Sequence, residues 1–495
     1  MQLSLSNIEY AYPSAAEPAL HGVTAAFPKG WTGIVGDNGS GKTTLALIAC
    51  GLLIPDAGTV TPSLVSRYCA QDATEPPGNL EDFSYAYDGV AVRLRNDLAI
   101  EDDWHLRFST LSGGQQKRLQ VACALWSSPD VLVMDEPTNH VDSSTRREIS
   151  AVLTQFGGIG LLISHDRELL DALCEQCLFV SGGSAIMRPG GYTQSSSQAS
   201  LERSSAIHAR QTARKEKARI EREAQRRREE ASRSAGKRSL KGVSKHDADA
   251  RYKKRIAVVS GQDGKAGKLS SRMSGRLESV NARLAETRVE KRYDAEVWLE
   301  AEPSRRKILL RMKPQTLALG EAILRTPALF IGNTDHICLV GDNGSGKTTL
   351  VKSIVEHLPK GTRYLYIPQE PDETQKQTAL RQLNELPSEK RGRVLAIVAL
   401  LNSDPDRILE GDAISPGEMR KLMLALGILD SPELIIMDEP TNHLDLGSTE
   451  TLERMLAAYP GALLLVSHDF ALVEAATSFM WETRRSHSGY ELVVR

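Results

Sequence analysis

Hydrophobic residues are distributed differently at the two ends of the chain and in its middle. The short apolar run at 31–35 predicts a strand, and those at 131–134 and 434–437 are typical of buried strands of a parallel sheet. The segment TLALIACGLL, close behind the first run, has the pattern of a helix. Buried strands accompanied by helices predict an α/β fold at both ends of the chain.

The middle of the chain predicts long helices instead. Residues 198–233 are rich in Ala, Arg and Glu and contain no Pro or Gly, which predicts one long helix. Residues 275–301 predict a second helix with an apolar stripe. The segment between them, 234–270, is basic and contains several glycines, so a helical hairpin with a basic tip is favoured over one stretched helix. The stripe consists of Leu277, Val280, Leu284, Val289, Tyr293 and Val297, and the glycines are Gly236, Gly242, Gly261, Gly264 and Gly267.

Three motifs occur twice along the chain at a nearly constant offset. GDNGSGKTTL, at 36–45, returns at an offset of 305, and MDEPTNH, at 134–140, returns at an offset of 303. LISHD, at 162–166, is answered by LVSHD, again at an offset of 303. Such an offset indicates duplicated domains. The predicted organisation is a first repeat at 1–190, a basic helical linker at 191–313 and a second repeat at 314–495.

The charge of the chain is unevenly distributed. The 495 residues carry a formal net charge of −2, yet residues 201–313 contain 32 Lys and Arg against 16 Asp and Glu. A basic segment between two acidic blocks favours contact with nucleic acid, although a solvated charged helix would have the same composition.

Composition excludes several classes of protein. A hydrophobic fraction of 41% and a charged fraction of 25% exclude a wholly disordered chain. No apolar run approaches the ~18 residues that a membrane span needs. The first residues, MQLSLSNIEYAYP, lack the basic and apolar regions of a secretory signal, and six cysteines form no disulfide framework. These features favour a cytoplasmic protein without a membrane span.

The first repeated motif has the pattern of a phosphate-binding loop. Residues 36–43 fit G-x-x-x-x-G-K-[ST] between an expected strand and an expected helix, which is the context that the motif requires. Its glycines let backbone N–H groups surround phosphates at a helix N-terminus. Lys42 would neutralise the β- and γ-phosphates and Thr43 would bind Mg²⁺. The second copy supplies Gly341, Gly344, Gly346, Lys347 and Thr348.

An acidic pair ends one apolar run in each repeat. Asp135 and Glu136 follow the run at 131–134, and Asp438 and Glu439 follow the run at 434–437. Ligands bind at this end of the strands in open α/β sheets. The first acid of each pair would hold hydrated Mg²⁺, and the second would orient or deprotonate the attacking water. A loop cap is the alternative interpretation of such a pair.

These motifs, together with Leu111-Ser-Gly-Gly-Gln115, resemble the ATP-binding cassette superfamily, whose signature sequence the last one matches. The resemblance implies two P-loop domains that bind ATP and Mg²⁺. A lone histidine is more often structural, but His165 and His468 at a matched offset favour the family's switch histidines. Catalysis is thus assigned to Glu136, Glu439, His165 and His468, and the metal to Thr43, Gln71, Asp135, Thr348, Gln369 and Asp438. The nucleotide contacts are Tyr12, Gly36, Asn38, Gly39, Gly41, Lys42, Thr43, Thr44, Gln71, Ser112 and Gly114 in the first repeat, and Gly341, Asn343, Gly344, Gly346, Lys347, Thr348, Thr349, Gln369, Ser415 and Gly417 in the second.

Two tandem cassettes, a basic linker and EPTNH followed by Val-Asp or Leu-Asp resemble the ABC-F family in particular. That resemblance implies an ATPase that binds the ribosome, with the linker contacting rRNA and tRNA near the peptidyl-transferase centre. Translation control and protection against ribosome-targeting antibiotics both remain open. One ATP would lie between Lys42 and Ser415 and the other between Lys347 and Ser112. No homo-oligomer is required, because one chain contains both halves of this sandwich.

The second repeat departs from the family pattern at two positions. Pro416 replaces a signature glycine and removes one N–H donor, but Ser415 is a good N-cap and proline suits the first helical turn. We therefore predict that the helix forms and that this site has an altered rate. Leu317 stands where Tyr12, the expected adenine-stacking residue, has its counterpart.

Some residues and functions have less support. Cys174 and Cys177 have C-x-x-C spacing without a second ligand pair, and Tyr293 and Trp298 suit packing better than stacking on RNA. The alternatives to a ribosomal ATPase are a twin-cassette importer subunit, a DNA-maintenance ATPase and a binding clamp. The span from Lys42 to Asp135 is too short for the inserted coiled coil of a DNA-maintenance ATPase.

Overall fold

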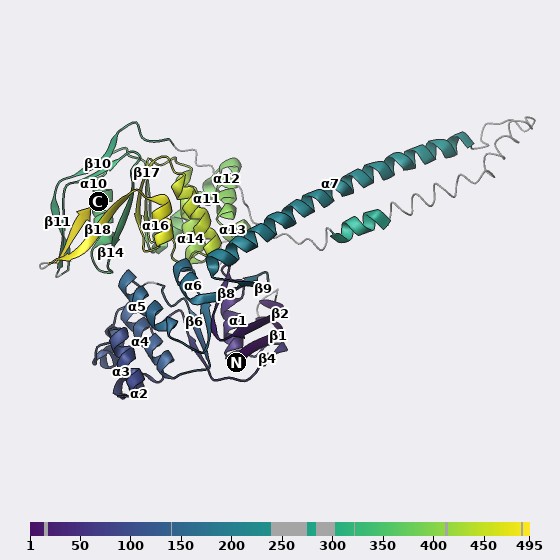
Figure 1. The fold of residues 1–495 in the computed structure, drawn as a ribbon. Coiled ribbons are helices and arrows are strands. Elements are labelled where there is room, and N and C mark those ends of the chain that lie inside the picture. The colour runs from purple at the N-terminus through teal and green to yellow at the C-terminus, as the bar shows by residue number, and fades with distance from the viewer. Residues whose placement is uncertain are drawn as a thin grey trace, which may run out of the picture. The chain divides into compact units, whose positions relative to one another are not determined.

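The chain divides into two compact units. In a computed structural model, one unit comprises residues 1–195 with 292–495, and the other comprises residues 196–291 (Figure 1). The structure describes residues 1–13, 18–139, 141–238, 275–283, 302–320, 322–410, 414–486 and 489–495.

The first repeat is built on a six-stranded sheet in the order β5-β6-β7-β3-β8-β9. Its strands run parallel except β9, which pairs antiparallel with β8. A separate antiparallel sheet has the order β2-β1-β4. The bounds in chain order are β1 Gln2–Tyr10, β2 Leu20–Pro28, β3 Gly30–Gly36, β4 Ala57–Thr61, β5 Ser66–Cys69, β6 Val131–Asp135, β7 Ile159–Ile163, β8 Cys174–Ser181 and β9 Ser184–Pro189.

Strand β6 confirms the prediction of a strand that is buried on both faces. All five of its residues are buried. Leu132 and Met134 join the core formed with helices α2 to α6, whereas Val131 and Val133 join the core formed with β1, β2 and α1. Alternate side chains of one strand therefore serve two cores. The helices are α1 Lys42–Ala49, α2 Leu80–Tyr85, α3 Gly89–Asp97, α4 Gly113–Trp126, α5 Ser143–Thr154 and α6 Arg167–Leu173, with a 3₁₀ segment at Trp104–Thr110.

The second repeat has the same plan on an eight-stranded sheet in the order β11-β12-β19-β18-β14-β17-β16-β15. Its strands are β11 Gln315–Leu319, β12 Ala322–Thr326, β14 His336–Gly341, β15 Tyr364–Ile367, β16 Leu434–Asp438, β17 Ala462–Val466, β18 Phe479–Ser486 and β19 Gly489–Val494. Its helices are α10 Lys347–His357, α11 Glu373–Glu385, α12 Ser388–Leu400, α13 Pro405–Glu410, α14 Pro416–Ile428, α15 Leu446–Ala457 and α16 Phe470–Ala476.

One strand of this repeat lies ahead of residue 314, where the sequence suggested that the repeat begins. Strand β10 (Ile308–Met312) pairs antiparallel with β13 (Leu329–Gly332). Leu309, Leu310 and Met312 are buried in a core that they share with β14, β16 and α10. These residues therefore pack as part of the second repeat.

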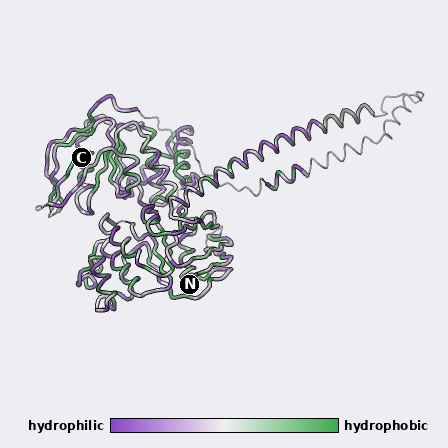
Figure 2. The backbone as a smooth tube through the Cα atoms, viewed as in Figure 1, coloured by the Kyte–Doolittle hydropathy of each residue, from purple (hydrophilic) through white to green (hydrophobic). Residues whose placement is uncertain are grey.

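The linker begins with α7, a helix of 47 residues from Tyr192 to Arg238. It contains the helix predicted at 198–233 and consists mainly of hydrophilic residues (Figure 2). A shorter helix covers residues 275–283. Ala213 and Ile220 of α7 pack with Val280, and Glu216 lies 3.5 Å from Arg283, as expected for the two arms of the hairpin. The tip beyond residue 238 and the stripe from Leu284 onward, including Tyr293 and Trp298, lie outside the described residues.

Candidate nucleotide sites

The first phosphate loop connects β3 to α1 with glycines in conformations that other residues avoid. Gly41, directly before α1, has φ of 97°. A Cβ on Gly36 would lie 2.1 Å from the backbone oxygen of Val180, so the loop packs against β8 only because that position has no side chain. A Cβ on Gly39, by contrast, would meet no atom within 4 Å, although the φ of 76° at that position also favours glycine.

Each loop holds its lysine among its own carbonyl groups. Lys42 Nζ donates to the backbone oxygens of Gly36 at 2.8 Å and Asp37 at 2.9 Å. Lys347 Nζ donates to the backbone oxygens of Gly341 at 2.6 Å and Asp342 at 3.1 Å. Both lysines are buried, and burial lowers the pKa of each ammonium despite nearby acids. A desolvated ammonium at a helix N-terminus is suited to hold an anion such as a phosphate.

The residues assigned to the metal are partly brought together. Thr43 Oγ1 donates to Asp135 Oδ2 at 3.0 Å, and Thr348 Oγ1 donates to Asp438 Oδ2 at 2.8 Å. Hydroxyl and carboxylate oxygens are the ligands that Mg²⁺ prefers, so each pair fits this ion. Among the residues that the structure describes, no side-chain contact joins Gln71 or Gln369 to these pairs.

Tyr68 is a member of the site that the sequence analysis did not identify. Its hydroxyl donates to Asp135 Oδ2 at 2.8 Å, and burial followed by the charge of Asp135 raises its pKa. Tyr366 takes the matching place in the second repeat, where burial and the charge of Asp438 raise its pKa as well. The sequence offered one clue to these tyrosines, because each stands three residues before an expected metal-binding glutamine.

The second acid of each pair adopts a backbone conformation that is unusual for glutamate. Glu136 has φ of 48° and Glu439 has φ of 46°, in the left-handed region that favours glycine. Each backbone N–H donates to the neighbouring strand, to Ile163 oxygen at 2.8 Å and to Val466 oxygen at 2.7 Å. The sheet therefore holds a sparsely populated conformation, as is common at functional positions.

Each of these glutamates lies beside one predicted switch histidine. Glu136 Oε1 is 3.4 Å from His165 Nε2, and Glu439 Oε1 is 3.6 Å from His468 Nε2. The backbone N–H of each histidine donates to the other carboxylate oxygen, at 3.3 and 3.4 Å. The structure thus brings each expected catalytic pair together.

Burial shifts the pKa values of the glutamates and the histidines in opposite directions. It raises the pKa of Glu136 to about 8, with a further contribution from Asp135, and that of Glu439 to about 7. It lowers the pKa of His165 to about 3, with a further contribution from Lys42, and that of His468 to about 4, with contributions from Lys347 and Arg146. Carboxyl groups that titrate near neutrality are suited to accept a proton, and the histidines are neutral.

The signature serines act as helix N-caps in both repeats. Ser112 caps α4 in a capping box with Gln115, and Ser415 caps α14 in a capping box with Glu418. Pro416 occupies the first turn, so the predicted helix is confirmed. A serine hydroxyl that accepts the cap hydrogen bond keeps its own O–H to donate.

Two predicted nucleotide residues near these loops contact the protein itself. The hydroxyl groups of Tyr12 and Thr44 lie 3.0 Å apart, and Tyr12 is two-fifths exposed after β1. Leu317, at the matching place of the second repeat, lies in β11 and packs against the core. Gln71 is exposed, and its backbone oxygen accepts from Lys117 Nζ at 3.0 Å.

Several contacts join the two repeats. Asn38, in the first phosphate loop, donates from Nδ2 to the backbone oxygen of His443 at 3.0 Å. Arg167 forms an ion pair with Glu453 at 2.9 Å. Tyr192, the first residue of α7, also donates to Glu450 of the second repeat at 2.8 Å. The loop of one repeat is therefore tied to the segment that follows the acidic pair of the other.

Cys174 and Cys177 do not resemble a metal or redox site. They begin β8 directly after α6, both are buried, and burial raises the pKa of both thiols. In the described part of the chain, no group of three or more His, Cys, Asp or Glu side chains is placed to hold a metal ion.

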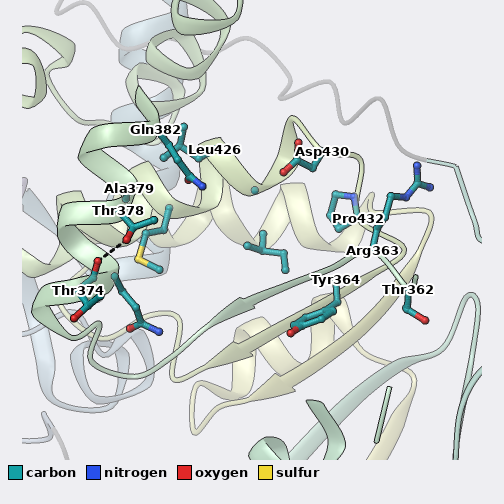
Figure 3. A pocket seen from close by; sticks show the side chains of 14 residues that line it. Thr362, Arg363, Tyr364, Thr374, Thr378, Ala379, Gln382, Leu426, Asp430 and Pro432 are labelled. Atoms are coloured by element: carbon teal, nitrogen blue, oxygen red, sulfur yellow. Dashed lines mark hydrogen bonds between the residues drawn. The ribbon is translucent and has the colours of Figure 1, made fainter. Parts of the chain in front are cut away.

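A groove in the second repeat lies apart from the candidate nucleotide and metal residues. It has a volume of about 660 Å³ and is lined by β15, α11 and α14. Figure 3 shows Arg363 and Tyr364 on one side of it and Thr374, Thr378 and Gln382 on the other. None of the candidate nucleotide or metal residues lines it.

Comparisons with known proteins agree with this arrangement. The family model described as ABC transporter matches residues 20–139 and 324–442. Ribosome protection protein VmlR of Bacillus subtilis (strain 168) is 26% identical over 497 residues, which cover 96% of this chain and 85% of that protein. ATP-binding protein Uup of Buchnera aphidicola subsp. Schizaphis graminum (strain Sg) is 26% identical over 485 residues, covering 90% and 75%.

A further relative and a solved structure extend the comparison. Tylosin resistance ATP-binding protein TlrC of Streptomyces fradiae is 28% identical over 544 residues, covering 94% of each chain. A structure of RNase-L Inhibitor superposes with a TM-score of 0.65 at 17% identity, covering 99% of this chain and 90% of that one, which shows a shared fold. In the described residues, no helix is long and apolar enough to span a membrane.

A duplicated α/β fold with a phosphate loop, a signature helix, an acidic pair and a switch histidine in each half is that of two ATP-binding cassette domains, and the ABC transporter model matches both halves of this chain. Its relatives confirm the resemblance to the ABC-F family over most of its length.

Proposed function

We propose that the chain hydrolyses ATP at two composite sites between its cassettes. The observation that carries this proposal is the recurrence of one buried glutamate–histidine pair in each cassette, with matched distances and a raised glutamate pKa. Glu136 and Glu439 accept a proton from the attacking water. His165 and His468, which are neutral, orient the water and the terminal phosphate by hydrogen bonding.

The other residues neutralise and hold the phosphates. Lys42 and Lys347 place their charges at the start of α1 and α10. Mg²⁺, when bound, supplies further neutralisation of phosphate charge. Thr43 and Asp135 would hold it in the first cassette and Thr348 and Asp438 in the second, with Gln71 and Gln369 as additional ligands.

Electrostatic contacts across the cassettes support sites that draw on both halves. Besides the bond from Asn38 to His443, the charge of Asp445 in the second cassette acts to raise the pKa of Lys42 in the first. Asp142 acts in the same sense on Lys347. In this proposal one ATP lies between Lys42 and Ser415, and the other lies between Lys347 and Ser112. ATP then holds the cassettes together, and hydrolysis loosens them.

We further propose that the protein works on ribosomes in the cytoplasm. The support is the basic linker and the names of two relatives, a ribosome protection protein and a tylosin resistance protein. On α7, Arg214, Lys215, Arg219 and Arg222 are exposed, and the last three follow one helical face. In this proposal the linker contacts rRNA and tRNA and reaches the peptidyl-transferase region, to modulate translation or to protect it from antibiotics.

The test is ribosome sedimentation with the Glu136→Gln/Glu439→Gln variant, which should bind ATP without turning it over. We expect co-sedimentation with ATP and none without it. As the matched control, Lys42→Ala/Lys347→Ala added to this variant should stay in the supernatant.

A second arm replaces Arg214, Lys215, Arg219 and Arg222 with Gln. If these residues contact phosphates, the slope of log affinity against log salt should become shallower by about 0.7 to 0.9 for each phosphate that is no longer neutralised. No sedimentation at low salt would overturn the ribosomal proposal, and co-purification with a permease would favour an importer subunit instead.

A further inference from the structure

Arg146, on α5 of the first cassette, contacts the switch-histidine segments of both cassettes. Its Nη2 donates to Asp166 Oδ1, directly after His165, and to Glu168 Oε2 at 2.8 Å. Its Nη1 donates to the backbone oxygen of His468 in the second cassette at 3.2 Å. One planar guanidinium therefore joins two segments that each carry a histidine assigned to hydrolysis.

The segment on the first-cassette side is held rigidly. Asp166 caps α6 by accepting from Leu169 N at 3.0 Å, and its other oxygen accepts from Thr138 Oγ1 at 3.1 Å. Arg167, the next residue, is ion-paired with Glu453 of the second cassette. These bonds fix the turn that contains His165 and Asp166. A shift of His165 therefore moves the Asp166 carboxylate, to which Arg146 donates.

The second cassette has no arginine at the position that corresponds to Arg146. At the repeat offset, Thr449 corresponds to Arg146, and Thr449 is buried. Phe470 corresponds to Arg167 and is exposed. Within the described part of the chain, the arginine that links the two switch segments therefore comes from the first cassette and has no arginine counterpart in the second.

We propose that Arg146 is a positioning residue that couples the two hydrolysis sites, by holding the turn after His165 and the carbonyl of His468 at one guanidinium. The inference rests on the proposed two-site hydrolysis. The fork of donors in arginine makes this possible, since lysine offers a single point charge and cannot satisfy both partners in the same geometry.

The test compares ATP turnover by the full chain with turnover by its two single-site variants. Glu439→Gln leaves the Glu136 site active, and Glu136→Gln leaves the Glu439 site active. Coupled sites give a parent rate that differs from the sum of the two single-site rates, by about fivefold or more for typical coupling. The ratio to follow is the parent rate divided by the sum of the two single-site rates. Arg146→Ala, introduced into all three proteins, should bring this ratio to about one.

Matched variants separate coupling from general damage. Arg146→Lys keeps the positive charge but not the fork, so its ratio should also be close to one. Arg147→Ala removes the exposed neighbouring arginine of the same helix and should leave the parent ratio unchanged. Melting temperatures of the Arg146 variants close to that of the parent establish that they are folded.

The outcomes distinguish the two proposals. A parent ratio of one, or a ratio that Arg146→Ala leaves unchanged, overturns the coupling while hydrolysis stands. If Arg147→Ala brings the ratio as close to one as Arg146→Ala does, the coupling through Arg146 is also overturned. No turnover by the parent chain overturns the proposed hydrolysis and removes the coupling with it.

Discussion

Replacing Glu136 with glutamine should stabilise the nucleotide-free protein in a pH-dependent manner. Burial raises the pKa of this side chain from 4.5 to about 8. Below pH 4.5 the group is protonated in both states and carries no penalty. As the pH rises from 4.5 to about 8, the unfolded chain loses the proton first, so the folded state becomes less stable relative to it.

The size of the effect follows from the width of this window. Each pH unit above 4.5 costs about 1.4 kcal/mol, so at pH 7 the buried carboxyl lowers the free energy of unfolding by about 3 kcal/mol. Glutamine has the same shape and does not ionise, and its amide oxygen can still accept from the backbone N–H of His165. For a domain of this size, we expect the melting temperature to rise by about 6 to 12 °C.

The assay is thermal unfolding of both proteins without nucleotide, in chelator, from pH 4.5 to 8.5. The gain should be absent at pH 4.5 and should grow with pH. Glu75→Gln, at an exposed position in a loop, is the control and should show no such trend. A gain that is smaller than about 2 °C at pH 7, or that does not depend on pH, would refute the argument from burial.

Three further predictions test other parts of the site. Gly36→Ala should abolish ATP binding at the site that includes Lys42 and destabilise the first cassette, because its Cβ would meet Val180 oxygen at 2.1 Å. Gly39→Ala meets nothing within 4 Å and should cost only about 1 to 2 kcal/mol of backbone strain; equilibrium binding and melting of the pair would decide. Lys117→Met should lower ATP turnover at the Glu136 site more than at the Glu439 site, because Lys117 Nζ donates to the backbone oxygens of Ala70 and Gln71 at 2.8 and 3.0 Å. Equal losses of turnover in the two single-site backgrounds would contradict this. Pro416→Gly restores a backbone N–H, so in the Glu136→Gln/Glu439→Gln background it should raise ATP affinity at the site that includes Ser415, and unchanged affinity in a titration would count against a role for that donor.

Much of the fold could be predicted from local pattern. The apolar run at 131–134 is a strand that is buried on both faces, and the capping chemistry of Ser415 allows a helix to begin at Pro416. Both features depend on residues that are close in sequence, where propensity and capping rules apply.

The parts that were missed depend on register between distant strands. Tyr68 reaches Asp135 because β5 pairs with β6 so that Cys69 lies opposite Met134, and no motif specifies that register. Lys117 and Arg146 similarly act on segments that are remote in sequence. The phosphate-loop motif identified which residues have the chemistry, but it contained no information on these supporting contacts.

The left-handed backbone of Glu136 and Glu439 has a consequence for how this chain can change over generations. Glycine would relieve the backbone strain and the buried carboxyl together at either position. Glutamate and glycine codons differ by a single base, so random mutation supplies this replacement often. A lineage that no longer needed hydrolysis would drift readily to glycine at both places and become more stable. In the proposed hydrolysis, glutamate in both copies therefore supplies the chemistry at a cost in folding stability.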